Sequence, residues 1–159
     1  MRVLLVRHGH AGTKRNWNGD DRLRPLDPPG VAESEALAVR LIPFGPTRII
    51  SSPYQRCVES VTPLSAVCAR PIERSEALGP EGGEGAKNLV LDLAANGAGT
   101  FVVCTHGEVI HYLQTHLGSD GPPTFGEQSP REKASVWILD GTGGRFINAT
   151  YLPPPLPAG

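Results

Sequence analysis

Two histidines of this chain each follow a short apolar run and precede a glycine. His8 comes after residues 3–7 (VLLVR), and His106 comes after residues 100–105 (TFVVCT). Apolar runs of this length are typical of strands that are buried on both faces of a parallel sheet. Ligands bind in the crevice outside the carboxyl ends of such strands, so we expect the two histidines to share one site. A single histidine would more often be structural, but the repeated pattern favours a functional pair.

The first of these turns, Arg7-His8-Gly9, combines groups that suit phosphate chemistry. An arginine can bind two phosphate oxygens at once, and a neutral imidazole can attack phosphorus. Gly9, and Gly107 in the second turn, would let the backbone approach a phosphate closely. We therefore expect phosphoryl transfer through a phosphohistidine at His8. The alternative is that Arg7 and His8 only end a core strand at the solvent.

Further cations could complete a phosphate site. Arg56 lies near the start of a predicted helix that follows residues 51–53 (SSP), and the amides at a helix N-terminus favour an anion. Lys14 and Arg24 lie in a long polar segment, residues 10–30. We expect this segment to fold over the end of the first strand, where its cations could reach a substrate.

An acid that protonates a leaving group could come from the acidic, glycine-rich segment 74–85. Glu76 and Glu81 are both candidates, since either could reach the site. A metal centre built from His10 and the two histidines above is not favoured, because no suitably spaced carboxylates accompany them. We expect neither a metal nor a cofactor, with arginines supplying the positive charge.

Strand and helix patterns alternate along the chain. The predicted strands are residues 3–6, 47–50, 71–73 and 100–104. The predicted helices are residues 31–41, 53–68, 86–94 and 108–117. Residues 134–139 and 145–151 flank a glycine-rich turn and predict a hairpin. This order predicts an α/β fold, a three-layer α/β/α arrangement with a mostly parallel central sheet and a C-terminal edge hairpin.

The second predicted helix carries two local signals. A serine before Pro53 is expected to cap this helix, with Pro53 in its first turn. Pro63 lacks the backbone N–H that would bond to Glu59, so we expect a kink or a break there. The loops 10–29 and 118–133 are expected to set the choice of substrate.

Length and charge limit the architecture and the class of partner. A chain of 159 residues predicts one domain, residues 1–152, followed by a proline-rich tail at 153–159. The tail is expected to be extended, with a role as an SH3-type ligand as the alternative. The 15 basic and 16 acidic side chains give a net charge of −1, which offers no general field for nucleic acid or a membrane.

Two further features concern location and redox state. No apolar run approaches the length of a signal peptide core or a membrane span, so a cytoplasmic protein is expected. The three cysteines contain no C-x-x-C pair, which argues against a disulfide framework and a structural zinc site.

Three segments together resemble the signatures of the histidine phosphatase (phosphoglycerate mutase-like) superfamily. They are residues 4–9 (LLVRHG), 51–57 (SSPYQRC) and 104–107 (CTHG). Segments 10–14, 19–21, 24–27 and 44–45 are most similar to its small branch. That branch includes SixA-type phosphohistidine phosphatases and the phosphatase half of two-domain Nudix-plus-phosphatase enzymes. The chain lacks the long insertions of the mutases, so a mutase is not expected.

The resemblance implies a role for each matching residue. His8 would be the nucleophile, Arg7 and Arg56 would bind the phosphoryl group, His106 would stabilise it during transfer, and Glu76 would donate the proton. It implies a metal-independent hydrolase acting on a small phosphate ester, a nucleotide or protein phosphohistidine. The alternative is a non-catalytic domain that binds a phosphorylated ligand. The oligomeric state is left open.

Overall fold

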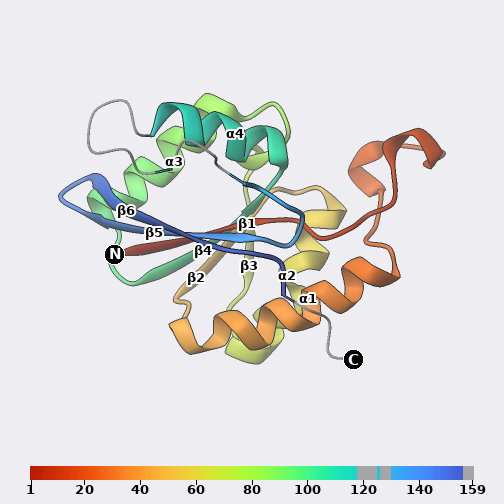
Figure 1. Ribbon diagram of the computed structural model, residues 1–159, viewed down its shortest axis with the longest axis horizontal. Coiled ribbons are helices and arrows are strands. Elements are labelled where there is room, and N and C mark those ends of the chain that lie inside the picture. Colours follow the sequence, from red (N-terminus) through yellow and green to blue (C-terminus); the bar gives the residue numbers. More distant parts are fainter. Residues whose placement is uncertain (118–124, 126–129, 156–159) are drawn as a thin grey trace.

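The structure is a computed structural model and describes residues 1–117, 125 and 130–155. These residues form one sheet in the order β3-β2-β4-β1-β5-β6 (Figure 1). The strands are β1 (Arg2–Arg7), β2 (Arg48–Ser51), β3 (Ile72–Arg74), β4 (Thr100–Thr105), β5 (Val136–Thr142) and β6 (Arg145–Leu152). Strands β1 to β4 pair in parallel, whereas β5 is antiparallel to both β1 and β6.

Helices cover both faces of the sheet. On one face lie α1 (Pro28–Leu41) and α2 (Gln55–Cys68), and on the other lie α3 (Gly83–Asn96) and α4 (Gly107–His116) (Figure 1). The predicted three-layer α/β/α fold with a mostly parallel sheet and an edge hairpin is therefore confirmed.

Strand β1 lies inside the sheet and explains why its apolar run is continuous. Leu4 and Val6 pack with α1 and α2, while Val3 and Leu5 pack with α3 and α4. None of these four side chains has any exposed surface. A strand covered by helices on both faces needs an apolar residue at every position.

The structure tests two predictions for α2, and the one for its serine cap was wrong. The helix begins at Gln55 and has no side-chain cap, because the hydroxyl of Ser52 is used elsewhere, in a contact with His106. The helix continues through Pro63, so of the expected kink or break only the break is excluded. A proline removes one hydrogen bond, and packing of an apolar helix face against α1 and the sheet outweighs that loss.

Helix α1 begins at Pro28, three residues earlier than predicted. The side chain of Asp27 accepts a hydrogen bond of 2.9 Å from the N–H of Gly30 and so caps the helix. Proline is well tolerated in the first turn, where the backbone N–H groups have no helical partner. At the other end of the chain, the described part of the tail is joined to α1 by a hydrogen bond from Arg40 to the carbonyl of Pro153.

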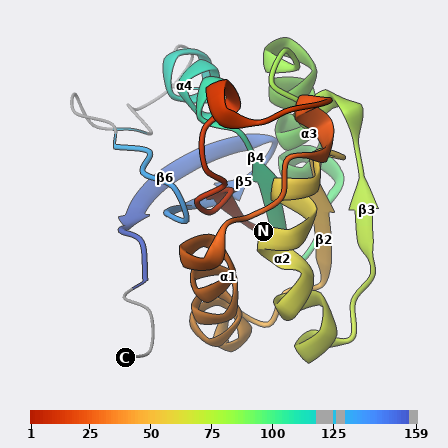
Figure 2. The same ribbon diagram turned by 90° about the vertical axis from the view of Figure 1, so that its right-hand side faces the viewer.

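The loop between β1 and α1 projects beyond the carboxyl end of the sheet (Figures 1 and 2). It contains two short 3-10 turns, η1 (Lys14–Asn16) and η2 (Asp21–Leu23). Viewed from that end, the loop crosses in front of the strands, as the sequence predicted (Figure 2). Most of the predicted loop 118–133 lies outside the described residues.

Two further findings concern the described helices and the cysteines. Among the described helices, none has the length and hydropathy needed to cross a bilayer. The three cysteines are free thiols, with Cys57 and Cys104 buried and Cys68 half-buried.

Candidate active site

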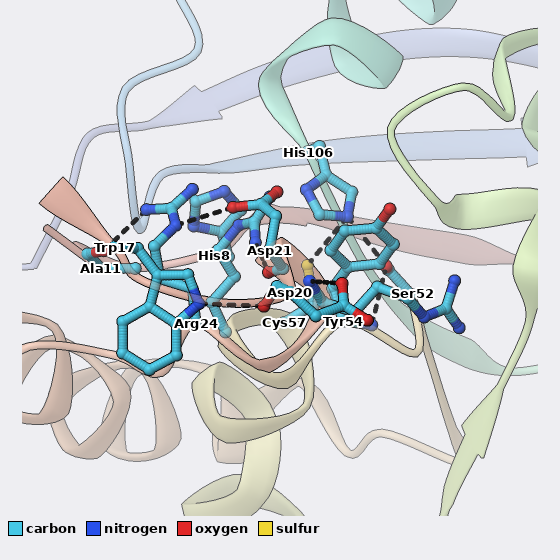
Figure 3. A network of polar contacts seen from close by, with 12 residues as sticks. His8, Ala11, Trp17, Asp20, Asp21, Arg24, Ser52, Tyr54, Cys57 and His106 are labelled. Carbon is cyan, nitrogen blue, oxygen red and sulfur yellow. Dashed lines mark hydrogen bonds and ion pairs between the residues drawn. The ribbon is translucent and has the colours of Figure 1, made fainter. Parts of the chain in front are cut away.

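The two histidines come together because β1 and β4 are parallel neighbours. Arg7 is aligned with Thr105 in the register of the two strands, so His8 and His106 each lie one residue beyond the same edge. The N–H of His8 donates to the carbonyl of Thr105 at 3.2 Å. The centroids of the two imidazole rings are 5.4 Å apart, with an angle of 67° between the ring planes (Figure 3).

The hydrogen bonds of His8 define which ring nitrogen can react. Nδ1 lies 2.8 Å from the carbonyl oxygen of Gly9. A carbonyl oxygen can only accept, so Nδ1 carries the hydrogen and Nε2 keeps a lone pair. Burial, together with the charges of Arg56, Arg7 and Lys133, lowers the pKa of His8 to about 3. His8 is therefore neutral at physiological pH, with Nε2 as a nucleophile.

The turn that presents His8 is held by α2. The N–H of Gly9 donates to Oγ of Ser60 at 2.9 Å, and the same hydroxyl donates to the carbonyl of Arg56 at 2.6 Å. Ser60 thus joins the turn that carries the nucleophile to the helical turn that carries an arginine of the site.

Helix α1 holds the same turn from its other side. The buried carboxylate of Glu33 accepts from the backbone N–H of His10 at 2.9 Å and lies 2.6 Å from Nδ1 of that histidine. Gly30 allows this approach, because a Cβ atom at that position would lie 1.9 Å from the carbonyl oxygen of His10. The position of the turn therefore depends on a glycine and a carboxylate of α1.

Arg56 is buried and is held by the loop after β1. Its two terminal nitrogens donate to the backbone carbonyl of Asp21 at 2.9 Å and to the carboxylate of Asp21 at 3.1 Å. Arg24 also binds this carboxylate, at 2.9 Å (Figure 3). Burial acts to raise the pKa of Asp21, but the two arginines outweigh it and hold that pKa below its ordinary value. Asp21 is therefore an anion that fixes both guanidinium groups.

His106 is positioned by a serine at the end of β2. Oγ of Ser52 lies 2.8 Å from Nε2 of His106 and accepts from the N–H of Tyr54 at 3.3 Å. Among the described residues, Nε2 of His106 is the acceptor that the hydroxyl hydrogen of Ser52 can reach. We therefore assign a hydrogen bond from this hydroxyl to Nε2, which places the ring hydrogen on Nδ1. Burial, with the charges of His8 and Arg56, lowers the pKa of His106 to about 2. His106 is thus a neutral donor at Nδ1.

Arg7 is fixed at the end of β1 by the residues around it. Its Nη1 donates to the carbonyl of Arg131 at 2.7 Å. A Cβ atom on Gly107 would lie 2.9 Å from the Cζ atom of Arg7, so only glycine leaves room for the guanidinium there. Burial is the main reason that the pKa of Arg7 is lowered, and the group still carries its charge at neutral pH.

Three buried N–H groups around His8 have no hydrogen-bond partner among the described residues. They are Nε of Arg7, Nε of Arg56 and Nδ1 of His106. Buried donors are almost always paired in folded proteins, so three unpaired donors at one place indicate that a ligand supplies the acceptors. A ligand with several acceptor oxygens would pair with all three donors. Because two of the donors belong to positively charged guanidinium groups, an oxyanion is favoured.

The remaining predicted site residues lie further out. Glu76 forms an ion pair of 2.8 Å with Arg22, and this bond holds the pKa of Glu76 below its ordinary value. Glu76 and Glu81 both line a pocket of about 300 Å³ that also includes Tyr54. The ring of Tyr54 is 4.9 Å from that of His106, so this pocket opens beside the two histidines.

The two loop cations differ in their surroundings. Lys14 is exposed in η1. Arg24 reaches the site through Asp21 and also donates to the carbonyl of Ala11 at 2.6 Å. Sequence reasoning did not single out Lys133, whose charge acts on His8. Within the described residues, no group of three or more His, Cys, Asp or Glu side chains could hold a metal ion.

Comparisons with known proteins show which proteins this chain resembles. The family model of the histidine phosphatase superfamily (branch 1) matches residues 3–79, which include Arg7, His8 and Arg56. Over these residues, about half of the chain, the protein is similar to the histidine phosphatase superfamily. The match covers the first two of the three segments that resembled this superfamily.

A curated relative is the 8-oxo-(d)GTP phosphatase of Mycolicibacterium smegmatis (strain ATCC 700084 / mc(2)155). It is 34% identical over 157 residues, a region that covers 96% of this chain and 48% of that protein. The chain therefore spans about half the length of the relative that it matches.

Solved phosphatase structures share the fold. The protein histidine phosphatase SixA complexed with tungstate has a TM-score of 0.76 at 23% identity, covering 99% of this chain and 97% of that one. A mycobacterial glucosyl-3-phosphoglycerate phosphatase in complex with VO3 has a TM-score of 0.72 at 17% identity, covering 92% and 96%. At these identities the likeness concerns the fold.

Proposed function

We propose that this chain is a metal-independent phosphatase that transfers a phosphoryl group from its substrate to Nε2 of His8 and then to water. The observation that carries the proposal is the set of three unpaired donors around a neutral imidazole: Nε of Arg7, Nε of Arg56 and Nδ1 of His106. A phosphoryl group in transfer has three equatorial oxygens, and these would accept from the three donors.

The first step forms one bond and breaks another. The lone pair on Nε2 of His8 attacks phosphorus as the ester P–O bond breaks, and the leaving oxygen takes a proton from a protonated carboxyl group at the edge of the site. The bond from Nδ1 of His8 to the carbonyl of Gly9 orients the ring and stabilises the positive charge that develops on it. Two guanidinium groups supply the positive charge that a metal ion provides in other phosphoryl transfer enzymes.

The second step restores the enzyme. A water molecule attacks the phosphorus of phosphohistidine, the P–N bond breaks, and inorganic phosphate leaves as His8 regains its lone pair. The proton lost by water can pass to a carboxylate at the edge of the site. In the present arrangement Glu76 is ionised and bound to Arg22, so it could accept this proton.

Glu76 and Glu81 line the same pocket beside Tyr54, so either carboxyl group could be the acid of the first step. Glu76 could act in this way only after it has released Arg22 and taken up a proton. Comparing Glu76→Gln with Glu81→Gln separates them. The variant that loses activity on alkyl phosphates but keeps activity on p-nitrophenyl phosphate, whose leaving group needs no proton, has lost the donor.

We propose a phosphate monoester as substrate, with a nucleotide favoured over protein phosphohistidine. The support is the relative that is named as an 8-oxo-(d)GTP phosphatase, which is 34% identical to this chain. A panel of nucleoside mono- and diphosphates, sugar phosphates and a phosphohistidine protein would rank these classes by kcat/KM.

Turnover of p-nitrophenyl phosphate in excess EDTA tests the reaction itself. The proposal predicts unchanged activity in chelator and loss of turnover in His8→Asn, whose amide can replace Nδ1 in the bond to Gly9 but has no nucleophilic nitrogen. Loss of activity in chelator that added metal restores would contradict metal independence. Phosphate binding without turnover would favour a non-catalytic domain.

A further inference from the structure

A second pocket lies in the loop after β1, apart from the three unpaired donors. It is about 210 Å³ in volume and lies between the beginning and the end of that loop. Apolar side chains form much of its wall: Ala11, Trp17, Pro25 and Leu26. The volume is below the range of roughly 300–1,000 Å³ that encloses a whole drug-sized ligand. The pocket therefore suits one ring system of a larger substrate.

Hydrogen bonds fix the wall of this pocket. The indole Nε1–H of Trp17 donates to the carbonyl of Asp20 at 2.9 Å, which leaves the indole face for contact (Figure 3). The N–H of Leu26 donates to Glu59 of α2 at 2.9 Å. The carboxylate of Asp27 accepts from the backbone of Gly12 at 3.0 Å as well as from α1. An indole and an aliphatic wall held in this way form a binding surface that needs little ordering when a ligand arrives.

One polar side chain of the pocket is uncommitted. The side-chain amide of Asn16 is exposed and has no hydrogen-bond partner in the parts of the chain that the structure describes. Arg24, in contrast, is bound to Asp21 and to the carbonyl of Ala11. A side-chain amide offers one acceptor and two donors, which match the polar edge of a nucleobase. The flat face of an indole stacks on a nucleobase of any kind.

The pocket is close enough to His8 to take part of the same substrate. Ala11 is three residues after His8, so their Cα atoms are at most about 11 Å apart. Arg24 lines the pocket and binds Asp21, which in turn binds Arg56. In Figure 3, Trp17 and Arg24 lie at one end of this network and His106 at the other, with His8 between them in that view.

We infer that this pocket binds the base of a nucleotide whose phosphate lies at His8, with the base stacked on Trp17 and its polar edge on Asn16. The inference rests on the proposed function and makes it more specific, because it assigns the selectivity for nucleotides to named residues. An aromatic side chain of a phosphopeptide would offer Asn16 at most one polar group, such as the tyrosine hydroxyl, whereas the edge of a nucleobase offers adjacent donors and acceptors.

Calorimetric titration of guanosine 5′-monophosphate and ribose 5-phosphate into the His8→Asn protein tests this inference without turnover. The nucleotide should bind at least tenfold more tightly than the sugar phosphate, as expected for one base stacked on an aromatic ring. Trp17→Ala should remove most of this difference and leave the affinity for ribose 5-phosphate unchanged. Trp17→Phe, which keeps a flat ring, should retain most of it.

Leu23→Ala is the matched control. Leu23 is an exposed apolar residue of the same loop, 59% accessible, and it does not line the pocket. This variant should keep the full preference for the nucleotide.

Equal affinities for the two ligands would overturn the inference, and so would an equal loss of both in Trp17→Ala. Preferential binding of an aromatic phosphopeptide would overturn it as well. If ribose 5-phosphate binds and the wild type hydrolyses it without any preference for the nucleotide, the inference about the base pocket is refuted and the proposed phosphatase function stands. If neither ligand binds and no phosphate ester is hydrolysed, the proposed function fails too.

Discussion

The two buried imidazoles predict that this protein loses stability in mild acid. In the folded protein the pKa values of His8 and His106 are lowered to about 3 and about 2, whereas an unfolded chain has histidine pKa values of about 6.5. Between these values the unfolded state binds more protons than the folded state. The free energy of unfolding therefore rises with pH in this window and is lost as pH falls below about 6.5.

The size of the effect follows from the same values. At pH 5 the pH lies about 1.5 units below the histidine pKa of the unfolded chain, so both histidines are protonated there. In the folded state both histidines stay neutral at this pH. Each histidine then lowers the free energy of unfolding by about 2 kcal/mol, or about 4 kcal/mol together. Carboxyl groups contribute little in this range, because their unfolded pKa values are about 4. A loss of about 4 kcal/mol is a large part of the typical stability of a small domain.

Urea unfolding at pH 7 and pH 5, followed by circular dichroism, measures this loss. With an m-value of about 1–3 kcal/mol/M, the midpoint should fall by roughly 1–4 M. The control is the double variant His8→Asn and His106→Gln, whose neutral amides can occupy the places of Nδ1 and Nε2. Its midpoint should change much less between the two pH values. An equal fall in the variant, or no fall in the wild type, would refute the reasoning.

Three further substitutions test how the site is held. Ser52→Ala removes the hydrogen bond that sets the tautomer of His106 and should lower kcat about 3- to 10-fold. An unchanged kcat would contradict the role of Ser52 in positioning His106. Gly107→Ala should raise KM for phosphate esters about tenfold, because the new Cβ would displace Arg7; an unchanged KM would contradict that. Glu33→Ala should lower the free energy of unfolding by about 1–3 kcal/mol, and Glu33→Gln, which keeps an acceptor, should recover most of it in urea titrations.

The sequence was sufficient to predict the pairing of the two histidines. Parallel strands place their carboxyl ends at the same edge, so two runs that each end in histidine and glycine had to meet if both runs joined one sheet. The register of β1 and β4 bears this out, since Arg7 and Thr105 are aligned.

Contacts made by loops could not be predicted in this way. Asp21 binds both Arg24 and Arg56, but an acid in a polar loop carries no periodic signal, and its partner is 35 residues away. Ser52 reads locally as a helix cap, yet its hydroxyl serves His106, which is a tertiary contact. Lys133 acts on His8 from a segment without regular structure. These residues surround the predicted site and were found only once the chain was folded.

The central claim is that Nε2 of His8 carries the phosphoryl group during turnover. Rapid mixing with a ³²P-labelled phosphate ester, followed by an alkaline quench and peptide mapping, tests it directly. The account predicts acid-labile, base-stable label on His8, attached at Nε2 because Nδ1 is bonded to the carbonyl of Gly9. Turnover without any labelled intermediate before the steady state, or label on His106 or on Nδ1 of His8, would contradict it.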